Sequence, residues 1–115
     1  MYTPLYLACQ KGFLGAEGVD SKSPEVMQKR RECVEILLKR GANVNFVSPK
    51  LRMTPLHWAG FHGDPLLVQM LLDYGAKLQF NVNDITPVDM AGFMGNAETV
   101  RTFTFWLEKK IRKED

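Results

Sequence analysis

The chain has 115 residues, with 15 basic and 13 acidic side chains and a formal net charge of +2. This length suits one domain with its own core, and a hydrophobic content of 45% argues against a disordered chain. So small a net charge argues against a protein that binds nucleic acid by neutralising phosphates. The sequence has no run of 18 apolar residues, the length that would predict a membrane span. The N-terminus lacks the pattern of a secretory signal.

The sequence contains two cysteines, Cys9 and Cys33. They are too few for a disulfide framework, and their spacing is not that of a metal-binding or redox pair. We therefore expect two small buried thiols in a reducing compartment. This predicts an intracellular, cytoplasmic protein and leaves the nucleus open.

A short Thr-Pro segment recurs three times, as Thr3-Pro4-Leu5, Thr54-Pro55-Leu56 and Thr86-Pro87-Val88. An alanine and then a glycine follow each copy at matching offsets. The second and third copies lie 32 residues apart, whereas the first and second lie 51 apart. This repetition indicates a repeat protein whose units are helix pairs, with extra residues inside the first unit.

The first unit opens at Thr3-Pro4, and its first helix is predicted to stop at Gly12. Residues 13–30 then interrupt the repeat pattern. Glycine, serine and aspartate in the early part of this insert predict an irregular loop. Ser23-Pro24-Glu25 combines a hydroxyl cap, a proline and an early carboxylate, which predicts a helix start. Apolar residues at helical spacing follow, so we expect one helix from about Pro24 to Arg40.

Three consecutive cations, Lys29, Arg30 and Arg31, fall within this predicted helix. They form either a binding appendage or a solvated basic face, and the sequence leaves both interpretations open. A loop that grows from a few residues to about ten costs only ~1 kcal/mol in closure entropy. The insert is therefore tolerable without a function of its own.

In the second unit, Thr54 suits an N-cap, Pro55 suits the first helical position, and Gly63 ends that helix. The next helix carries one apolar stripe and ends before Gly75. The stripe consists of Leu67, Val68, Leu71 and Leu72.

The third unit opens at Thr86-Pro87, and its second helix ends the chain in a run of charged residues. This polar end suits a terminal cap, which needs a wettable outer face. We expect four residues of this helix to face inward, namely Val100, Phe103, Leu107 and Ile111. Trp106 is expected to point partly outward; with Phe105 it either covers the last repeat or forms a second docking patch.

Thr54-Pro55-Leu56-His57-Trp58-Ala59, followed by Gly63 and by Val68-x-Met70-Leu71-Leu72-x-x-Gly75-Ala76, resembles the ankyrin repeat. Gly41-Ala42-Asn43-Val44-Asn45 resembles the turn segment of the same family. The resemblance implies an all-α fold, a short ankyrin-type solenoid of about three stacked helix pairs with extended inter-repeat hairpin loops. The implied units are residues 1–46 with the insert at about 13–30, residues 47–80, and residues 81–115 with the C-terminal cap.

Two departures from the family pattern stand out. Asp84 lies where the family usually has glycine, so the turn before Thr86 is expected to be distorted or less stable. Val88 and Asp89 lie where leucine and histidine are usual. The histidine that is present, His57, is given a structural role by the resemblance: hydrogen bonds to backbone and loop groups that tie neighbouring repeats together.

We find no pattern typical of catalysis. The cysteines and histidines show no spacing that suggests a nucleophile–base pair, and no glycine-rich phosphate loop or metalloprotease motif is present. His57 and His62 lie five apart, where side chains on a helix diverge, so they do not predict a metal site. The sequence predicts no catalytic residue, no metal and no cofactor.

In ankyrin-like proteins, partners usually contact the hairpin loops and the exposed ends of the first helices. Carried onto this sequence, those positions form an unusually apolar row. The predicted partner-binding residues are Met53, Phe61, His62, Ile85, Phe93, Met94, Tyr2 and Lys11. Exposed apolar clusters mark interfaces, but Phe61 and Phe93 could instead fold over and pack on neighbouring helices.

The resulting interpretation is a non-catalytic protein–protein interaction module, a scaffold or adaptor for a protein or peptide partner. The alternative is an ankyrin-type regulatory domain cut from a larger enzyme or channel. Self-association through the apolar row also stays open. We expect no specific nucleic-acid partner, and the sequence does not name the protein that is bound.

Overall fold

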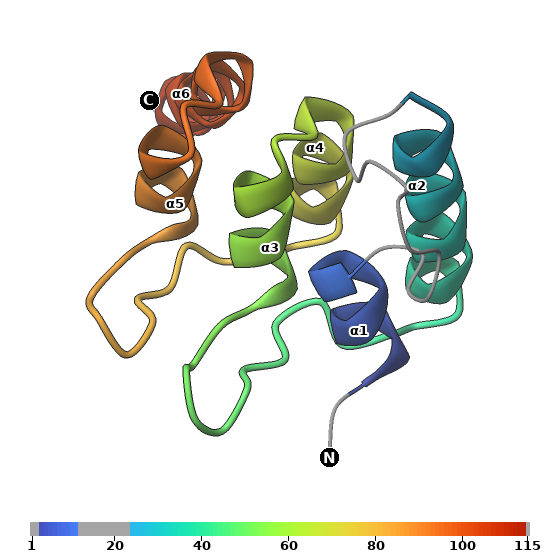
Figure 1. Ribbon diagram of the computed structural model, residues 1–115. Helices are drawn as coiled ribbons and strands as arrows, with labels where there is room; N and C mark the ends of the chain where they lie inside the picture. The colour runs from blue at the N-terminus through green and yellow to red at the C-terminus, as the bar shows by residue number, and fades with distance from the viewer. Residues whose placement is uncertain (1–2, 12–23, 115) are drawn as a thin grey trace.

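The computed structural model describes residues 3–11 and 24–114 of the chain, and the helices found there form three pairs (Figure 1). No strand occurs within these described ranges. The helices are α1 (Pro4–Lys11), α2 (Pro24–Lys39), α3 (Pro55–His62), α4 (Pro65–Asp73), α5 (Pro87–Phe93) and α6 (Ala97–Glu114). The predicted all-α repeat architecture is confirmed, as is the long helix from Pro24. The predicted irregular loop of the insert lies outside the described residues.

The helices form two layers (Figure 1). The first helices of the pairs, α1, α3 and α5, make one layer, and the second helices, α2, α4 and α6, make the other. The connections that lead into α3 and α5 project as loops from the same side of the stack. This arrangement leaves those loops and the adjoining faces of α3 and α5 without a further layer over them.

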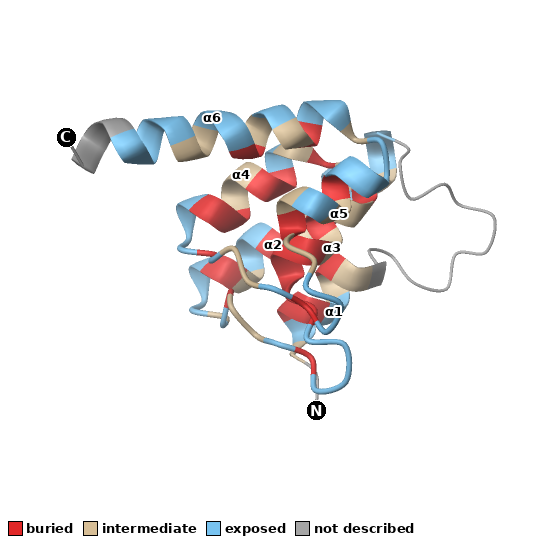
Figure 2. Ribbon diagram, turned by 90° about the vertical axis from the view of Figure 1, so that its left-hand side faces the viewer, coloured by how far each residue is buried: buried red, intermediate tan, exposed pale blue. Residues whose placement is uncertain are grey.

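The core lies between the two layers and between successive pairs (Figure 2). The apolar stripe predicted for α4 is buried, with Leu71 fully inaccessible to solvent. Its partners come from every helix of the stack. The buried set includes Leu5, Cys9, Val34, Leu38, Leu56, Ala59, Leu67, Val68, Leu72, Ala91 and Phe103.

The predicted start and stop signals of α3 are confirmed. The side-chain oxygen of Thr54 accepts a hydrogen bond from the backbone N–H of His57, and the His57 ring accepts one from the backbone N–H of Thr54. The two residues form a reciprocal capping box in which histidine takes the place of the usual glutamate. Gly63 ends the helix with φ of 75°, a left-handed conformation that favours glycine.

Both interpretations of the three cations in α2 are wrong, because only Lys29 is exposed. Arg30 is fully buried, since it lies on the same helical stripe as Val34 and Leu38. Burial lowers the pKa of the Arg30 guanidinium, and the nearby carboxylate of Asp64 opposes that shift.

Arg31 pairs with Asp64, the N-cap of α4. Its Nη1 atom donates to both carboxylate oxygens of Asp64, at 2.8 and 2.9 Å, and Asp64 also accepts from the backbone N–H of Leu67. Because Asp64 is fully buried, this charge needs its partners. The ion pair therefore joins the second helices of the first two units.

A comparable contact joins the second and third units. The side-chain amide of Asn96, just before α6, donates to the backbone oxygens of Gly60 and Phe61 at 2.9 and 3.2 Å. Asp64 and Asn96 each follow the glycine that ends a first helix. In both units, this polar residue reaches back to the preceding unit and fixes the packing of the pairs.

The prediction that Ile111 faces inward is wrong. This side chain is 62% exposed, whereas Phe103 is fully buried. The reason is length: α6 has 18 residues and its neighbour α4 has 9, so the last turns of α6 extend past the stack (Figure 2). Trp106 is half-buried against the core, as predicted, while Phe105 is exposed.

Cys9 is buried, as expected, but Cys33 is only half-buried. Both thiols are free. Burial raises the pKa of the Cys9 thiol to about 12, which makes it a poor nucleophile at neutral pH.

The turn at Asp84 has a left-handed backbone, with φ of 58°. This is the region that the family's usual glycine adopts without strain, so the turn keeps a left-handed residue at this position and the predicted distortion is not seen in the backbone angle; lower stability of the turn stays a prediction. Arg52, at the matching place in the preceding loop, has φ of 55° and carries no sequence signal that predicts it.

Gly60 and Gly92 provide a matched pair for testing the stacking distance. A Cβ atom at Gly60 would lie 2.6 Å from the carbonyl oxygen of Pro87, whereas one at Gly92 would have no neighbour within 4 Å. We expect Gly60→Ala to lower the free energy of unfolding by about 1–3 kcal/mol, because α5 must move away.

Gly92→Ala should instead leave the stability unchanged or raise it by up to about 1 kcal/mol, as expected for an exposed helical glycine. Urea denaturation followed by circular dichroism measures both. Equal effects of the two substitutions would contradict the close approach of α3 and α5.

Candidate partner-binding surface

The candidate site is the surface made by the two projecting loops, residues 46–54 and 80–86, together with the adjoining faces of α3 and α5. We name it the loop face. Each loop closes on itself through a buried polar residue. In the first, Ser48 and Met53 exchange hydrogen bonds: the Ser48 N–H donates to the Met53 oxygen, and the Met53 N–H to Ser48 Oγ. In the second, Asn81 and Ile85 are joined in the same way.

The two loops are also bonded to each other. The backbone N–H of Val82 donates to the oxygen of Leu51 at 2.9 Å, and Asn81 Nδ2 donates to Met53 Sδ at 3.3 Å. Because the loops share these contacts, their relative position is fixed by more than the chain connectivity. They form one surface.

His57 joins α3 to the second loop. Its Nδ1 atom accepts from the Thr54 N–H at 3.1 Å, so in the neutral ring the proton lies on Nε2, which donates to the Ile85 oxygen at 2.8 Å. Burial lowers the pKa of the His57 imidazole, and hydrogen bonds to the backbone oxygens of Ile85 and Gln79 oppose that shift. The structural role implied for His57 is confirmed.

An aromatic cluster borders the surface on α3. Trp58 Nε1 donates to the hydroxyl of Tyr6 at 3.0 Å, and His62 Nε2 donates to the backbone oxygen of Gln10 at 2.8 Å. Phe61 packs edge-on against Trp58 and His62, with ring centroids 5.4 and 5.3 Å apart. These contacts connect α3 to α1 and hold Phe61 half-buried.

Between the loops and these helices lies a hollow of about 230 Å³, which we name the loop hollow. Its walls are almost entirely apolar. It is lined by Leu51, Met53, Trp58, Phe61, Asn81, Val82, Asn83, Ile85 and Met90. Three of the predicted partner-binding residues, Met53, Phe61 and Ile85, come together here.

The other predicted residues are distributed differently. Phe93 is 73% exposed and Met94 is exposed as well, so Phe93 does not fold over its neighbours. Met53 and His62 are buried and contribute mainly to packing. Tyr2 and the side chain of Lys11 lie outside the described residues. Which of these residues a partner contacts stays a prediction.

Six of the residues that line the hollow are not among the predicted partner-binding residues: Leu51, Trp58, Asn81, Val82, Asn83 and Met90. Leu51 and Val82 lie in the two projecting loops, and Trp58 and Met90 lie on α3 and α5. An apolar residue at the tip of each polar loop is a signal that could have identified the first two, because exposed tips are usually polar.

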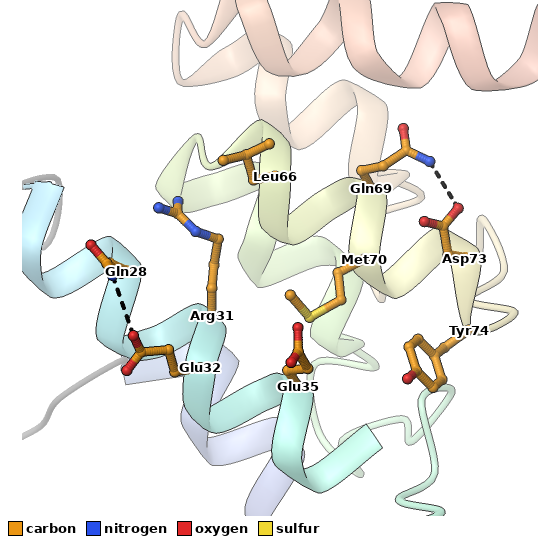
Figure 3. A pocket seen from close by; sticks show the side chains of 9 residues that line it. All are labelled: Gln28, Arg31, Glu32, Glu35, Leu66, Gln69, Met70, Asp73 and Tyr74. Atoms are coloured by element: carbon orange, nitrogen blue, oxygen red, sulfur yellow. Dashed lines mark hydrogen bonds between the residues drawn. The ribbon is translucent and has the colours of Figure 1, made fainter. Parts of the chain in front are cut away.

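A second hollow, of about 520 Å³, lies on the opposite layer between α2 and α4 (Figure 3). Its polar side chains are largely paired with one another or with neighbours. Gln28 donates to Glu32 and Gln69 to Asp73, while Glu35 pairs with Lys39. This back groove is a solvated surface with mixed charges, whereas the loop hollow is apolar.

The described residues contain no group of histidine, cysteine, aspartate or glutamate side chains that could hold a metal ion. Within the same ranges, no helix is long and apolar enough to cross a membrane.

Stacked helix pairs with loops projecting to one side define a helical repeat protein. A family model described as ankyrin repeats in three copies matches residues 25–114. The chain belongs to the ankyrin repeat family. Ankyrin repeats are protein–protein interaction modules, and such domains are generally non-catalytic.

Two human proteins are similar to part of the chain. Ankyrin repeat and SOCS box protein 6 is 34% identical over 59 residues, which cover 50% of this chain and 14% of that protein. ARF GTPase-activating protein GIT1 is 41% identical over 63 residues, which cover 54% of this chain and 8% of that protein. The chain therefore spans a small fraction of these relatives' length.

A similar solved structure is the human ASB11 ankyrin repeat domain. The TM-score is 0.69 at 26% sequence identity, and the match covers 90% of this chain and 40% of that chain.

The pKa of His57 predicts how stability depends on pH. Because the folded protein holds this pKa below the ordinary value of 6.5, the unfolded chain binds more protons as the pH falls below about 6.5. The contribution of His57 to the free energy of unfolding is therefore complete above about pH 6.5, and it is lost as the pH falls through the pKa of the folded protein.

Urea denaturation of the wild type and of His57→Gln between about pH 8 and pH 5 measures this effect. We expect His57→Gln to be less stable at pH 8 and to lose less stability on acidification than the wild type. Parallel pH profiles for the two proteins would contradict the assignment.

Proposed function

We propose that the chain binds a protein partner through the loop face. The observation that carries this proposal is the exposed apolar area there, above all Phe93, which is 73% exposed and adjoins the exposed Met94. Apolar surface left in water costs about 25 cal/mol per Å². Phe93 lies one helical turn after Met90, which lines the apolar hollow. Exposed aromatic side chains near apolar hollows are expected of an interface.

The rigidity of the loops supports the same surface. The bonds between Val82 and Leu51 and between His57 and Ile85 hold both loops in place before a partner arrives. A surface that is already ordered loses less conformational entropy on binding. The loop face is therefore better suited to binding than the back groove, whose charges are paired.

A second candidate is regulation within a larger enzyme or channel. It is favoured by the similarity to ARF GTPase-activating protein GIT1, a much longer protein whose name describes an activator of a GTPase and of which the matched segment makes up 8% of the length. In that case the same loop face would bind another part of the longer protein. The two candidates differ in whether the partner is a separate molecule.

Photo-crosslinking tests the face. We expect Phe93→p-benzoylphenylalanine to yield covalent adducts in an extract of the cells that make the protein. The matched control is Leu66→p-benzoylphenylalanine on the other layer, where Leu66 is 62% exposed and should yield none. Adducts from Leu66 alone would overturn the proposal, and a crosslink within one polypeptide would favour regulation in cis.

Once a partner is in hand, alanine at both Phe61 and Phe93 should weaken binding by about 2 kcal/mol or more, which is roughly 30-fold in Kd. Phe93→Ala by itself should leave the melting temperature unchanged, because that side chain makes little contact with the core. Calorimetric titration measures the affinity, and an unchanged Kd in the double variant would rule out this assignment.

A further inference from the structure

We propose that the loop hollow takes a single apolar side chain from a protein partner, and that a carboxylate in the same partner segment pairs with Lys50 or Arg52. This inference rests on the proposed function, because it names the chemistry that the loop face recognises. It concerns a part of that face distinct from Phe93.

Two polar side chains in the lining, Trp58 and Asn81, already use their polar atoms, so the hollow favours an apolar ligand group over a polar one. The indole N–H of Trp58 is already donated to Tyr6. Asn81 uses its side-chain oxygen for the backbone N–H groups of Asn83 and Ile85 and its Nδ2 for Met53 Sδ. A polar group that entered the hollow would lose its water without gaining these partners, whereas an apolar side chain gains from the transfer.

The size of the hollow points to one side chain. Its volume of about 230 Å³ is below the range of roughly 300–1,000 Å³ typical of pockets for drug-sized ligands and cofactors. One wall is the half-buried Met90, and the flexible side chain of methionine adapts to the shape of an inserted group. Leucine, isoleucine, methionine and phenylalanine therefore all suit the site.

Charge identifies what lies beside the apolar anchor. Lys50 and Arg52 flank Leu51 at the tip of the first loop, and both are exposed. Neither forms an ion pair within the part of the chain that the structure describes. Asp84, in the second loop, is exposed as well. A partner carboxylate is therefore attracted to the side of the first loop and repelled from the side of the second.

A peptide selection tests the inference directly, because it needs no natural partner. The probe is a phage-displayed library of random 12-residue peptides, selected against the immobilised 115-residue chain. We expect the enriched peptides to share one large apolar residue with an aspartate or glutamate a few positions away. Fluorescence anisotropy with the corresponding synthetic peptides then gives their Kd values.

Two sets of variants test the two parts of the proposal. Leu51→Ser combined with Val82→Ser removes apolar wall from exposed positions and should raise the Kd about tenfold or more. Lys50→Gln combined with Arg52→Asn removes the charges, and asparagine tolerates the left-handed backbone at that position. This pair should raise the Kd several-fold and weaken its dependence on salt.

Leu66→Ser combined with Tyr74→Ser is the matched control. These side chains are 62% and 44% exposed on the back groove, compared with 52% and 46% for Leu51 and Val82. The control should leave the Kd unchanged, and melting curves should show that every variant is folded.

Selection of no binding peptide, or of peptides that respond only to the control variants, would overturn the inference. Peptides that respond to Phe93→Ala but not to Leu51→Ser and Val82→Ser would also overturn it, while the proposed function would stand. A failure of the proposed function is detected separately, because the crosslinking experiment would then give adducts from Leu66 and not from Phe93.

Discussion

Burial of one apolar stripe between neighbouring helix pairs is the constraint on which the whole structure depends. A pair such as α3 and α4 cannot enclose its own stripe, so Leu71 and Val68 become inaccessible only when other pairs cover them. The same requirement orders the helices into two layers. With the stripes facing inward, most of each loop remains outside the core, although Met53 is buried and the connecting segments supply Val44 and Ala76 to it.

Polar contacts then decide how the pairs sit on one another. Asp64 and Asn96 reach back from one unit to the preceding one, and His57 reaches forward to the loop of the next. Apolar packing alone is non-directional, whereas these bonds require particular distances and angles. The stack is held by leucine side chains and aligned by a few polar groups, and one of those groups, His57, also holds a loop of the loop face in place.

The two surfaces of the stack differ because their polar groups differ in what they bond. On the back groove, carboxylates and amides exchange bonds with their own helical neighbours four residues away. On the loop face, the side chains of Asn81 and Trp58 form hydrogen bonds with other groups of the protein, and the surface that remains toward solvent is apolar. A surface with satisfied polar groups and uncovered apolar area is suited to a partner that supplies apolar groups of its own.

The sequence by itself determined the repeat, the predicted helix starts and stops and the buried stripe, because these follow from local spacing and capping chemistry. The role of His57 followed instead from the resemblance to the ankyrin repeat. Tertiary structure alone decided the burial of Arg30, the pairing of Arg31 with Asp64 and the exposure of Ile111. It also decided that Leu51, Val82 and Met90 share one hollow. Each of these features depends on how far a neighbouring helix or loop extends and on which side chain it presents. Packing between units far apart in the chain sets both, so no pattern within a single unit predicts them.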